Sequence, residues 1–149
     1  MLGFRGYDYG IWLAIGNTGR WRLGTGRRVE SWRDLDVWEV AHKLVLRVYE
    51  TARQFPADER FRLADQLCRA ATSIPTNIAE GKGRGSLKEY LQFLIVARGS
   101  VEELKYQLLL ARDLGYIGEG PYHEMTEGYE RVGKMLNGLI RSLRARSRA

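Results

Sequence analysis

The amino-acid sequence predicts an all-α protein: an antiparallel up-and-down four-helix bundle with a kinked second helix. Apolar residues recur at steps of three and four in four successive segments from Leu35 onward, which is the period of an amphipathic helix. Gly or Pro separates these segments, and residues 31–149 contain no alternating strand pattern bounded by turns. The length of 149 residues, with 44% hydrophobic and 28% charged residues, is typical of one globular domain.

The first predicted helix ends at Phe55-Pro56, because the residue before a proline avoids the helical region. Its apolar stripe consists of Leu35, Trp38, Ala41, Val45, Val48 and Ala52. Asp58 and Glu59 favour the start of the second helix, since acidic side chains stabilise a helix N-terminus. The second stripe consists of Ala64, Leu67, Ala71, Ile74 and Ile78. Pro75 predicts the kink, because proline removes one backbone hydrogen bond.

The third predicted helix begins at a capping box, in which the Ser86 hydroxyl and the Glu89 carboxylate satisfy each other's free backbone donors. Its stripe consists of Leu87, Leu91, Leu94, Ala97, Val101, Leu104, Leu108 and Ala111. Leu114-Gly115 ends it, since glycine is the usual C-terminal stop. The fourth stripe consists of Met125, Tyr129, Val132, Leu136, Leu139 and Leu143. The bundle is therefore expected over about residues 34–144.

Residues 1–30 differ in composition from the rest of the chain and form a Gly/Arg-rich arm. Seven of the 17 glycines fall here, too many for a helix and too irregular for a repeat. We expect this arm to be disordered, or to be an artefact of the chosen start site if the natural start is Val29. Residues 31–149 form the expected bundle domain with a basic C-terminal tail.

Charge is concentrated at the two ends of the chain. The formal net charge of +6 divides into +3 for residues 1–30, +6 for residues 131–149 and −3 for residues 31–130. Basic ends on a mildly acidic body suit an anionic polymer, which favours nucleic acid as a partner. The alternative is a tail that only keeps the protein in solution.

The candidate nucleic-acid-binding residues lie in two segments. They are Lys82, Arg84, Arg131, Lys134, Arg141, Arg144, Arg146 and Arg148. Four of them, Lys134, Arg141, Arg144 and Arg148, share an arc of roughly 80° if the last helix continues to Arg148. Because no recognition-helix motif and no stacking platform is evident, we expect binding of RNA or DNA that is salt-dependent and indifferent to sequence.

Few residues are suited to catalysis, so we expect no enzyme, no catalytic residue, no metal and no cofactor. Glu39-x-x-His42 matches one unit of a di-metal bundle site, but a second unit is missing, and pairing of Glu39 with Lys43 is expected instead. The Gly81–Gly85 segment follows a helix rather than a strand, which favours a turn over a phosphate-binding loop. The single cysteine, Cys68, is expected to fill space in the helix.

The chain has more aromatic and aliphatic residues than one bundle seam requires, which favours a homo-oligomer. Aromatic residues are enriched at subunit interfaces, although they also fill the wide ends of bundles. The residues expected to leave apolar patches are Val37, Val40, Leu44, Tyr90 and Leu109. No apolar run approaches the about 18 residues of a transmembrane helix, and we expect a cytoplasmic protein.

Several motifs resemble the bacterial four-helix-bundle proteins encoded in intervening sequences of 23S rRNA genes. They begin with Leu35-Asp36-Val37-Trp38, continue through Phe55-Pro56 and Arg69-Ala70-Ala71, and end with Leu114-Gly115-Tyr116. The most distinctive is Ser73-Ile74-Pro75-Thr76-Asn77-Ile78-Ala79-Glu80-Gly81. The resemblance covers about residues 32–143.

The resemblance implies a four-helix protomer that assembles into a homopentamer and has no known catalysis. Related proteins are accessory factors of diversity-generating retroelements, in which a basic pentamer binds nucleic acid and a reverse transcriptase. The motif residues Pro75, Asn77, Glu80 and Gly81 then have a structural role, with Asn77 and Glu80 hydrogen-bonding within the helix end. A protein-interaction scaffold, or a reverse-transcriptase accessory without a direct nucleic-acid role, remains the alternative.

Overall fold

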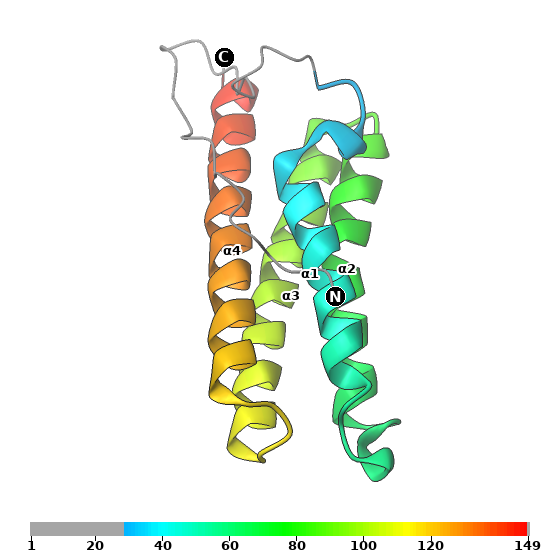
Figure 1. Ribbon diagram of the computed structural model, residues 1–149. Coiled ribbons are helices and arrows are strands. Elements are labelled where there is room, and N and C mark those ends of the chain that lie inside the picture. The colour runs from blue at the N-terminus through cyan, green and yellow to red at the C-terminus, as the bar shows by residue number, and fades with distance from the viewer. Residues whose placement is uncertain (1–28, 149) are drawn as a thin grey trace.

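Four long helices run alternately up and down in the computed structural model, which describes residues 29–148 (Figure 1). They are α1 (Asp36–Ala52), α2 (Leu63–Gly83), α3 (Leu87–Asp113) and α4 (Glu119–Ser147), with the short 3-10 turns η1 (Trp32–Asp34) before α1 and η2 (Ala57–Glu59) before α2. No strand occurs among the described residues, so the predicted four-helix bundle is confirmed. The expected arm lies almost wholly outside the described residues.

The helices form a square in which each contacts two others. Helix α1 packs on α2 and α4, and α3 packs on the same two helices, so α1 and α3 lie diagonally opposite. The predicted stripes supply the core, in which Leu67, Leu104 and Leu136 are fully buried. In the fourth stripe the prediction was wrong at one position, because Ile140 is buried and Leu139 is only partly buried.

Helices α2 and α3 approach each other closely near Gly81. A Cβ atom on Gly81 would lie 2.8 Å from Phe93 Cβ and 2.9 Å from Tyr90 Cδ2. Further along the same pair, the hydroxyls of Ser73 and Ser100 lie 2.5 Å apart and hydrogen-bond across the interface. Pro75 lies inside α2, which continues as one helix to Gly83; the kink there remains a prediction.

The helix ends depart from the predicted capping. Ser86 Oγ accepts a hydrogen bond from Glu89 N at 3.4 Å, as expected, but the Glu89 carboxylate pairs with Arg84 at 4.0 Å. A complete capping box occurs instead at η1, between Ser31 and Asp34. Helix α3 ends at Asp113, and the chain then turns at Gly115, whose φ of 77° favours glycine because it has no Cβ atom.

The alternating directions bring three segments to one end of the bundle. The start of α1, the connection between α2 and α3, and the last turns of α4 lie together at the top of Figure 1. The connections between α1 and α2 and between α3 and α4 form the other end. None of the described helices has both the length and the apolar character needed to cross a membrane.

Candidate nucleic-acid interface

Positive charge gathers at the end of the bundle where α2 and α4 finish. We define the basic end as Lys82, Arg84, Arg141, Arg144, Arg146 and Arg148. Tyr90, in the first turn of α3, lies between the end of α2 and the end of α4. Lys82 Nζ is 5.9 Å from its ring centroid, and the charge of Arg146 is close enough to affect the pKa of its hydroxyl. Burial raises the pKa of Tyr90 to about 12, although the nearby Arg146 charge lowers it. The structure thus unites residues about 60 positions apart in the chain.

The arginines of α4 are presented to solvent. Arg141, Arg144, Arg146 and Arg148 are all exposed, as is Arg84, whereas Lys82 is half-buried. Helix α4 continues to Ser147, and Arg148 is its C-cap, so the condition for the predicted arc is nearly met. These charges also oppose the negative end of the α4 dipole, which gives them a stabilising role independent of any ligand.

The bundle is electrostatically polarised along its length. Residues 29–42, 76–92 and 134–148, which form the basic end and its surroundings, contain nine basic and six acidic side chains. Residues 47–66 and 102–127, at the opposite end, contain six basic and ten acidic side chains. A polyanion is therefore attracted to one end of the bundle and repelled from the other.

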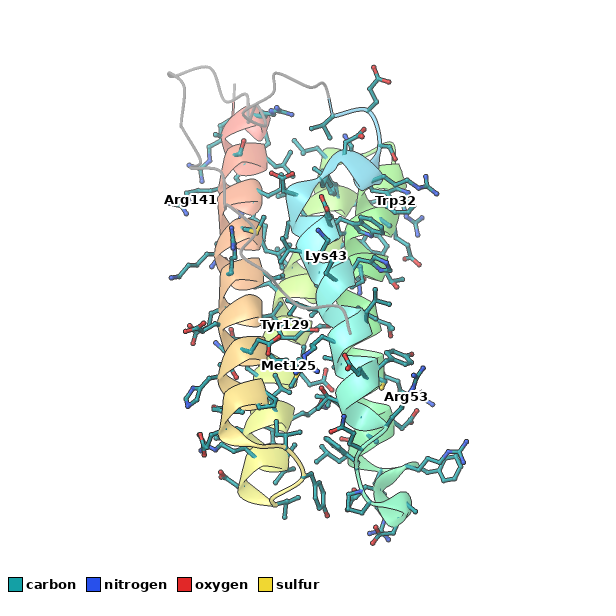
Figure 2. All side chains as sticks on the ribbon, in the orientation of Figure 1. Trp32, Lys43, Arg53, Met125, Tyr129 and Arg141 are labelled. Atoms are coloured by element: carbon teal, nitrogen blue, oxygen red, sulfur yellow. The ribbon has the colours of Figure 1, made fainter. Side chains whose placement is uncertain are left out.

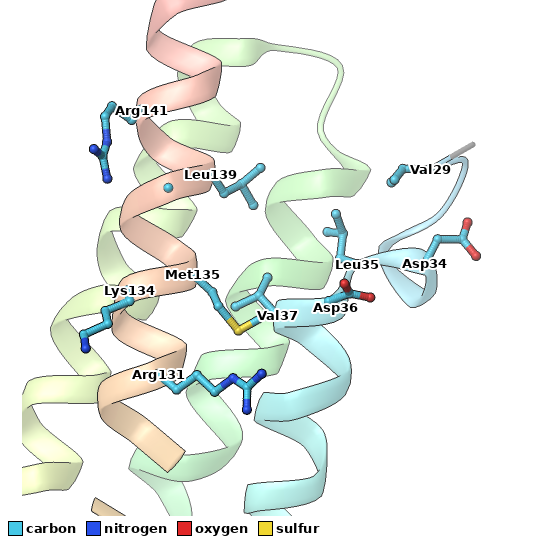
Figure 3. A pocket seen from close by; sticks show the side chains of 11 residues that line it. Val29, Asp34, Leu35, Asp36, Val37, Arg131, Lys134, Met135, Leu139 and Arg141 are labelled. Atoms are coloured by element: carbon cyan, nitrogen blue, oxygen red, sulfur yellow. The ribbon is translucent and has the colours of Figure 1, made fainter. Parts of the chain in front are cut away.

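Arg131 lies outside the predicted arc of α4 and faces α1. It is half-buried and points toward α1, whereas Lys134 and Arg141 point to the other side of α4 (Figure 3). It lines a groove of about 410 Å³ between α1 and α4. The floor of this groove is apolar, with Leu35, Val37, Met135 and Leu139 among its lining residues. Lys134 and Arg141, which belong to the predicted arc, also line this groove, although their side chains leave α4 on the other side.

The α1 side of the groove is acidic. Asp34 and Asp36 line it opposite Arg131. Burial raises the pKa of Asp36, and the nearby charge of Glu39 raises it further. The groove therefore has mixed charge, with Arg131, Lys134 and Arg141 on its α4 side.

The structure also shows an aromatic column, which the sequence analysis did not find. It consists of Arg33, Trp32, Trp38 and His42. The ring centroids of Trp32 and Trp38 are 4.6 Å apart, and their planes are tilted by 60°. Those of Trp38 and His42 are 5.2 Å apart, and their planes are stacked at an angle of 6°. The Arg33 guanidinium carbon lies 4.0 Å from the Trp32 ring centroid. Helical spacing connects Trp38 with His42, but Trp32 joins them only because the chain turns at η1.

Comparison with known proteins identifies the family. Residues 33–138 match the family described as 23S rRNA-intervening sequence protein. The chain belongs to this family.

A crystal structure of a protein of unknown function from the S23 ribosomal protein family, from Bacteroides thetaiotaomicron VPI-5482, has a similar fold. The TM-score is 0.66 at 23% sequence identity, and the match covers 70% of this chain and 95% of the other. No curated protein matches the chain. This likeness concerns the fold alone.

In this member of the 23S rRNA-intervening sequence family, most of the distinctive motif has a structural explanation. Gly81 allows the close approach of α2 and α3, and Asn77 Nδ2 donates to the Ser73 carbonyl at 2.7 Å. Glu80 is exposed and has no hydrogen bond or ion pair to another described residue, so the bond expected of it is not formed. Pro75 is buried in α2.

The remaining candidates from the sequence have local roles. Lys43 Nζ pairs with Glu39 Oε1 at 2.7 Å, which confirms the expected i,i+4 pair beside His42. Cys68 is half-buried, and burial raises the pKa of its thiol, which disfavours the reactive thiolate. Over residues 29–148, no three His, Cys, Asp or Glu side chains lie close enough together to hold one metal ion.

Proposed function

We propose that this family member is a non-enzymatic protein that binds RNA or DNA through the basic end, without sequence preference. The observation that carries the proposal is the exposure of Arg141, Arg144, Arg146 and Arg148 on a helix end that has no acidic residue. Guanidinium groups bind phosphate oxygens through paired hydrogen bonds. Lys82 and Arg84 extend the same positive surface across to α2.

We propose further that the protein is a homo-oligomer, with five copies as the family resemblance implies. Three of the five residues first expected to form apolar patches do not support this, because Val37, Leu44 and Tyr90 are buried, whereas Val40 and Leu109 are half-buried. Other side chains do. Leu46 is 57% exposed on α1, and Tyr106 is 63% exposed on α3 with Ile95 on the same helix.

The position of these two apolar faces favours a ring over a two-fold dimer. Because α1 and α3 are diagonally opposite, the α1 face with Leu46 and Tyr49 and the α3 face with Ile95 and Tyr106 point in different directions. A contact between two different faces is heterologous and closes into a ring when the rotation permits. In such a ring, the basic ends lie on one rim and their charges add.

Fluorescence anisotropy with labelled RNA and DNA oligonucleotides of unrelated sequence tests the binding. The variant R141A/R144A/R146A/R148A is expected to bind more weakly than the parent. The affinity of the parent should also fall with salt, by about 10³- to 10⁵-fold between 50 and 200 mM if it contacts six to ten duplex phosphates. The matched control is R53A/R60A/R62A/R69A, which removes four exposed arginines away from the basic end. It is expected to bind like the parent.

A protein-interaction scaffold, such as an accessory of a reverse transcriptase, is the second candidate, and the two exposed apolar faces favour it. If the α4 variant binds RNA and DNA as tightly as the parent at low salt, the basic end is not the interface and the scaffold is preferred. Light scattering that gives the 17.1 kDa monomer mass at micromolar concentration would contradict the oligomer.

A further inference from the structure

The aromatic column lies at the end of the bundle that also carries the basic end. Its first residues belong to η1, which packs on both α1 and α2, and α2 finishes at Lys82 and Gly83, just before Arg84. Trp32 is seen beside the upper half of the helices in Figure 2, on the opposite side of the view from Arg141. Aromatic rings and phosphate-binding cations thus share one part of the molecule, as in proteins that bind single strands.

We infer that the aromatic column is a stacking site for unpaired nucleobases, so that the protein prefers single-stranded RNA or DNA to duplex. This inference rests on the nucleic-acid binding proposed above and adds the kind of strand that is bound. In a duplex, neighbouring base pairs cover both faces of each base. Only unpaired bases can therefore stack on protein rings.

The column has two ends on which a base can stack. His42 is exposed, and because one face of its imidazole lies parallel to Trp38, the exposed area belongs to the other face and the ring edge. At the opposite end, the guanidinium carbon of Arg33 lies over the Trp32 ring, 4.0 Å from its centroid. Arginine planes, like aromatic rings, stack on bases.

The column is held in place before any ligand arrives. The Asp34 carboxylate accepts hydrogen bonds from Ser31 N at 2.9 Å and from Glu30 N at 3.1 Å, and Ser31 Oγ accepts one from Arg33 N at 3.2 Å. These bonds fix the turn that carries Trp32, while Trp38 packs partly against the core. A preorganised ring loses little conformational freedom on binding, which favours stacking.

Two of the acidic residues beside the column, Glu39 and Asp34, are engaged within the protein, which limits their repulsion of phosphate. Glu39 pairs with Lys43 at 2.7 Å, and the Asp34 carboxylate holds the two backbone N–H groups of the capping box. Leu46, the strongly exposed aliphatic side chain of α1, lies one turn beyond His42 on the same helix face, so a contact with a second protein chain is the competing outcome that the oligomer mass tests.

The test compares a labelled 15-nucleotide oligo(U) and oligo(dT) with a duplex of equal length by fluorescence anisotropy. The parent is expected to bind the single strands at least about fivefold more tightly, the smallest effect of one stacked base. Trp32→Ala and His42→Ala are each expected to weaken single-strand binding at least about fivefold and to leave duplex binding within about twofold. Trp32→Phe and His42→Phe retain a ring and are expected to restore the affinity.

Phe61→Ala is the matched control, because Phe61 is an exposed aromatic residue in the connection between α1 and α2, at the opposite end of the bundle. It should leave binding unchanged. Single-strand affinities of Trp32→Ala and His42→Ala equal to that of the parent would overturn the stacking site and leave the basic end intact. In that outcome, the α4 variant R141A/R144A/R146A/R148A would lose binding while Trp32→Ala and His42→Ala would not. A lower oligomer mass in Trp32→Ala would also overturn it, since the column would then be a contact between protein chains.

Discussion

Replacement of Gly81 by alanine should destabilise the bundle, although alanine is the better helix former. Three atoms surround the position that the new Cβ would take: Phe93 Cβ at 2.8 Å, Tyr90 Cδ2 at 2.9 Å and the Tyr90 carbonyl oxygen at 3.3 Å. Two of these atoms cannot rotate away. The Tyr90 oxygen belongs to the backbone, and Phe93 Cβ is bonded directly to the backbone of its own residue. Relief therefore requires a movement of α2 relative to α3.

The expected magnitude follows from two opposing terms. Overpacking of a well-packed interface costs about 1–3 kcal/mol, and moving the buried Tyr90 ring would place the loss in the upper part of that range. The higher helix propensity of alanine returns up to about 1 kcal/mol. We expect a net loss of about 1–2 kcal/mol in the free energy of unfolding, or about 4–8 °C in Tm for the described residues.

Thermal and urea denaturation, followed by circular dichroism at 222 nm at one protein concentration, measure this loss. Gly83→Ala is the control, because it lies in the same helix and its new Cβ would meet nothing within 4 Å. We expect it to leave stability unchanged or to raise it by up to about 1 kcal/mol. If Gly81→Ala proves as stable as Gly83→Ala, the close approach of α2 and α3 does not explain the glycine of the family motif.

Two further predictions concern the core. Gly128→Ala places a Cβ 2.7 Å from Leu44 Cδ2, the far end of a flexible side chain, so it should cost less than Gly81→Ala, within about 1 kcal/mol; a larger loss by urea denaturation would contradict this. Burial raises the pKa of Tyr129 and Tyr90, the latter to about 12, above the value of about 10 in the unfolded chain. The unfolded state therefore releases these protons first, and the free energy of unfolding should fall above pH 10 by up to about 1.4 kcal/mol per pH unit for each tyrosine. Urea denaturation from pH 8 to 11 should show this fall and a smaller one in Tyr129→Phe; equal slopes would refute the assignment.

The helical periodicity was sufficient to predict the fold, because each stripe repeats often enough to identify a buried face. Ala41, Leu67, Leu104 and Leu136 were expected in the core and are fully buried there. The period is less decisive at its edges. Leu139 and Ile140 are both apolar neighbours, and only the direction of the adjacent helices decides that Ile140 is covered.

The oligomer patches were less predictable for the same reason. Val37 and Leu44 flank the centre of their stripe, and sequence spacing cannot tell whether a flanking residue meets a neighbouring helix. In the bundle both are buried, and Leu44 packs against α4 at Gly128. Leu46 and Tyr106, which lie farther from the buried faces, are the side chains that remain exposed.

The sequence by itself determined the four helices, their order and the basic character of the α4 terminus, because these depend on local spacing and composition. Only the tertiary structure decided which distant charges share a surface. Antiparallel packing brings Lys82 and Arg84 to the end of α4, while the rotation of that helix turns Arg131 toward α1. The aromatic column likewise depends on the turn at η1, which places Trp32 on Trp38. Such contacts arise where the chain changes direction, and there the helical period no longer relates one residue to the next.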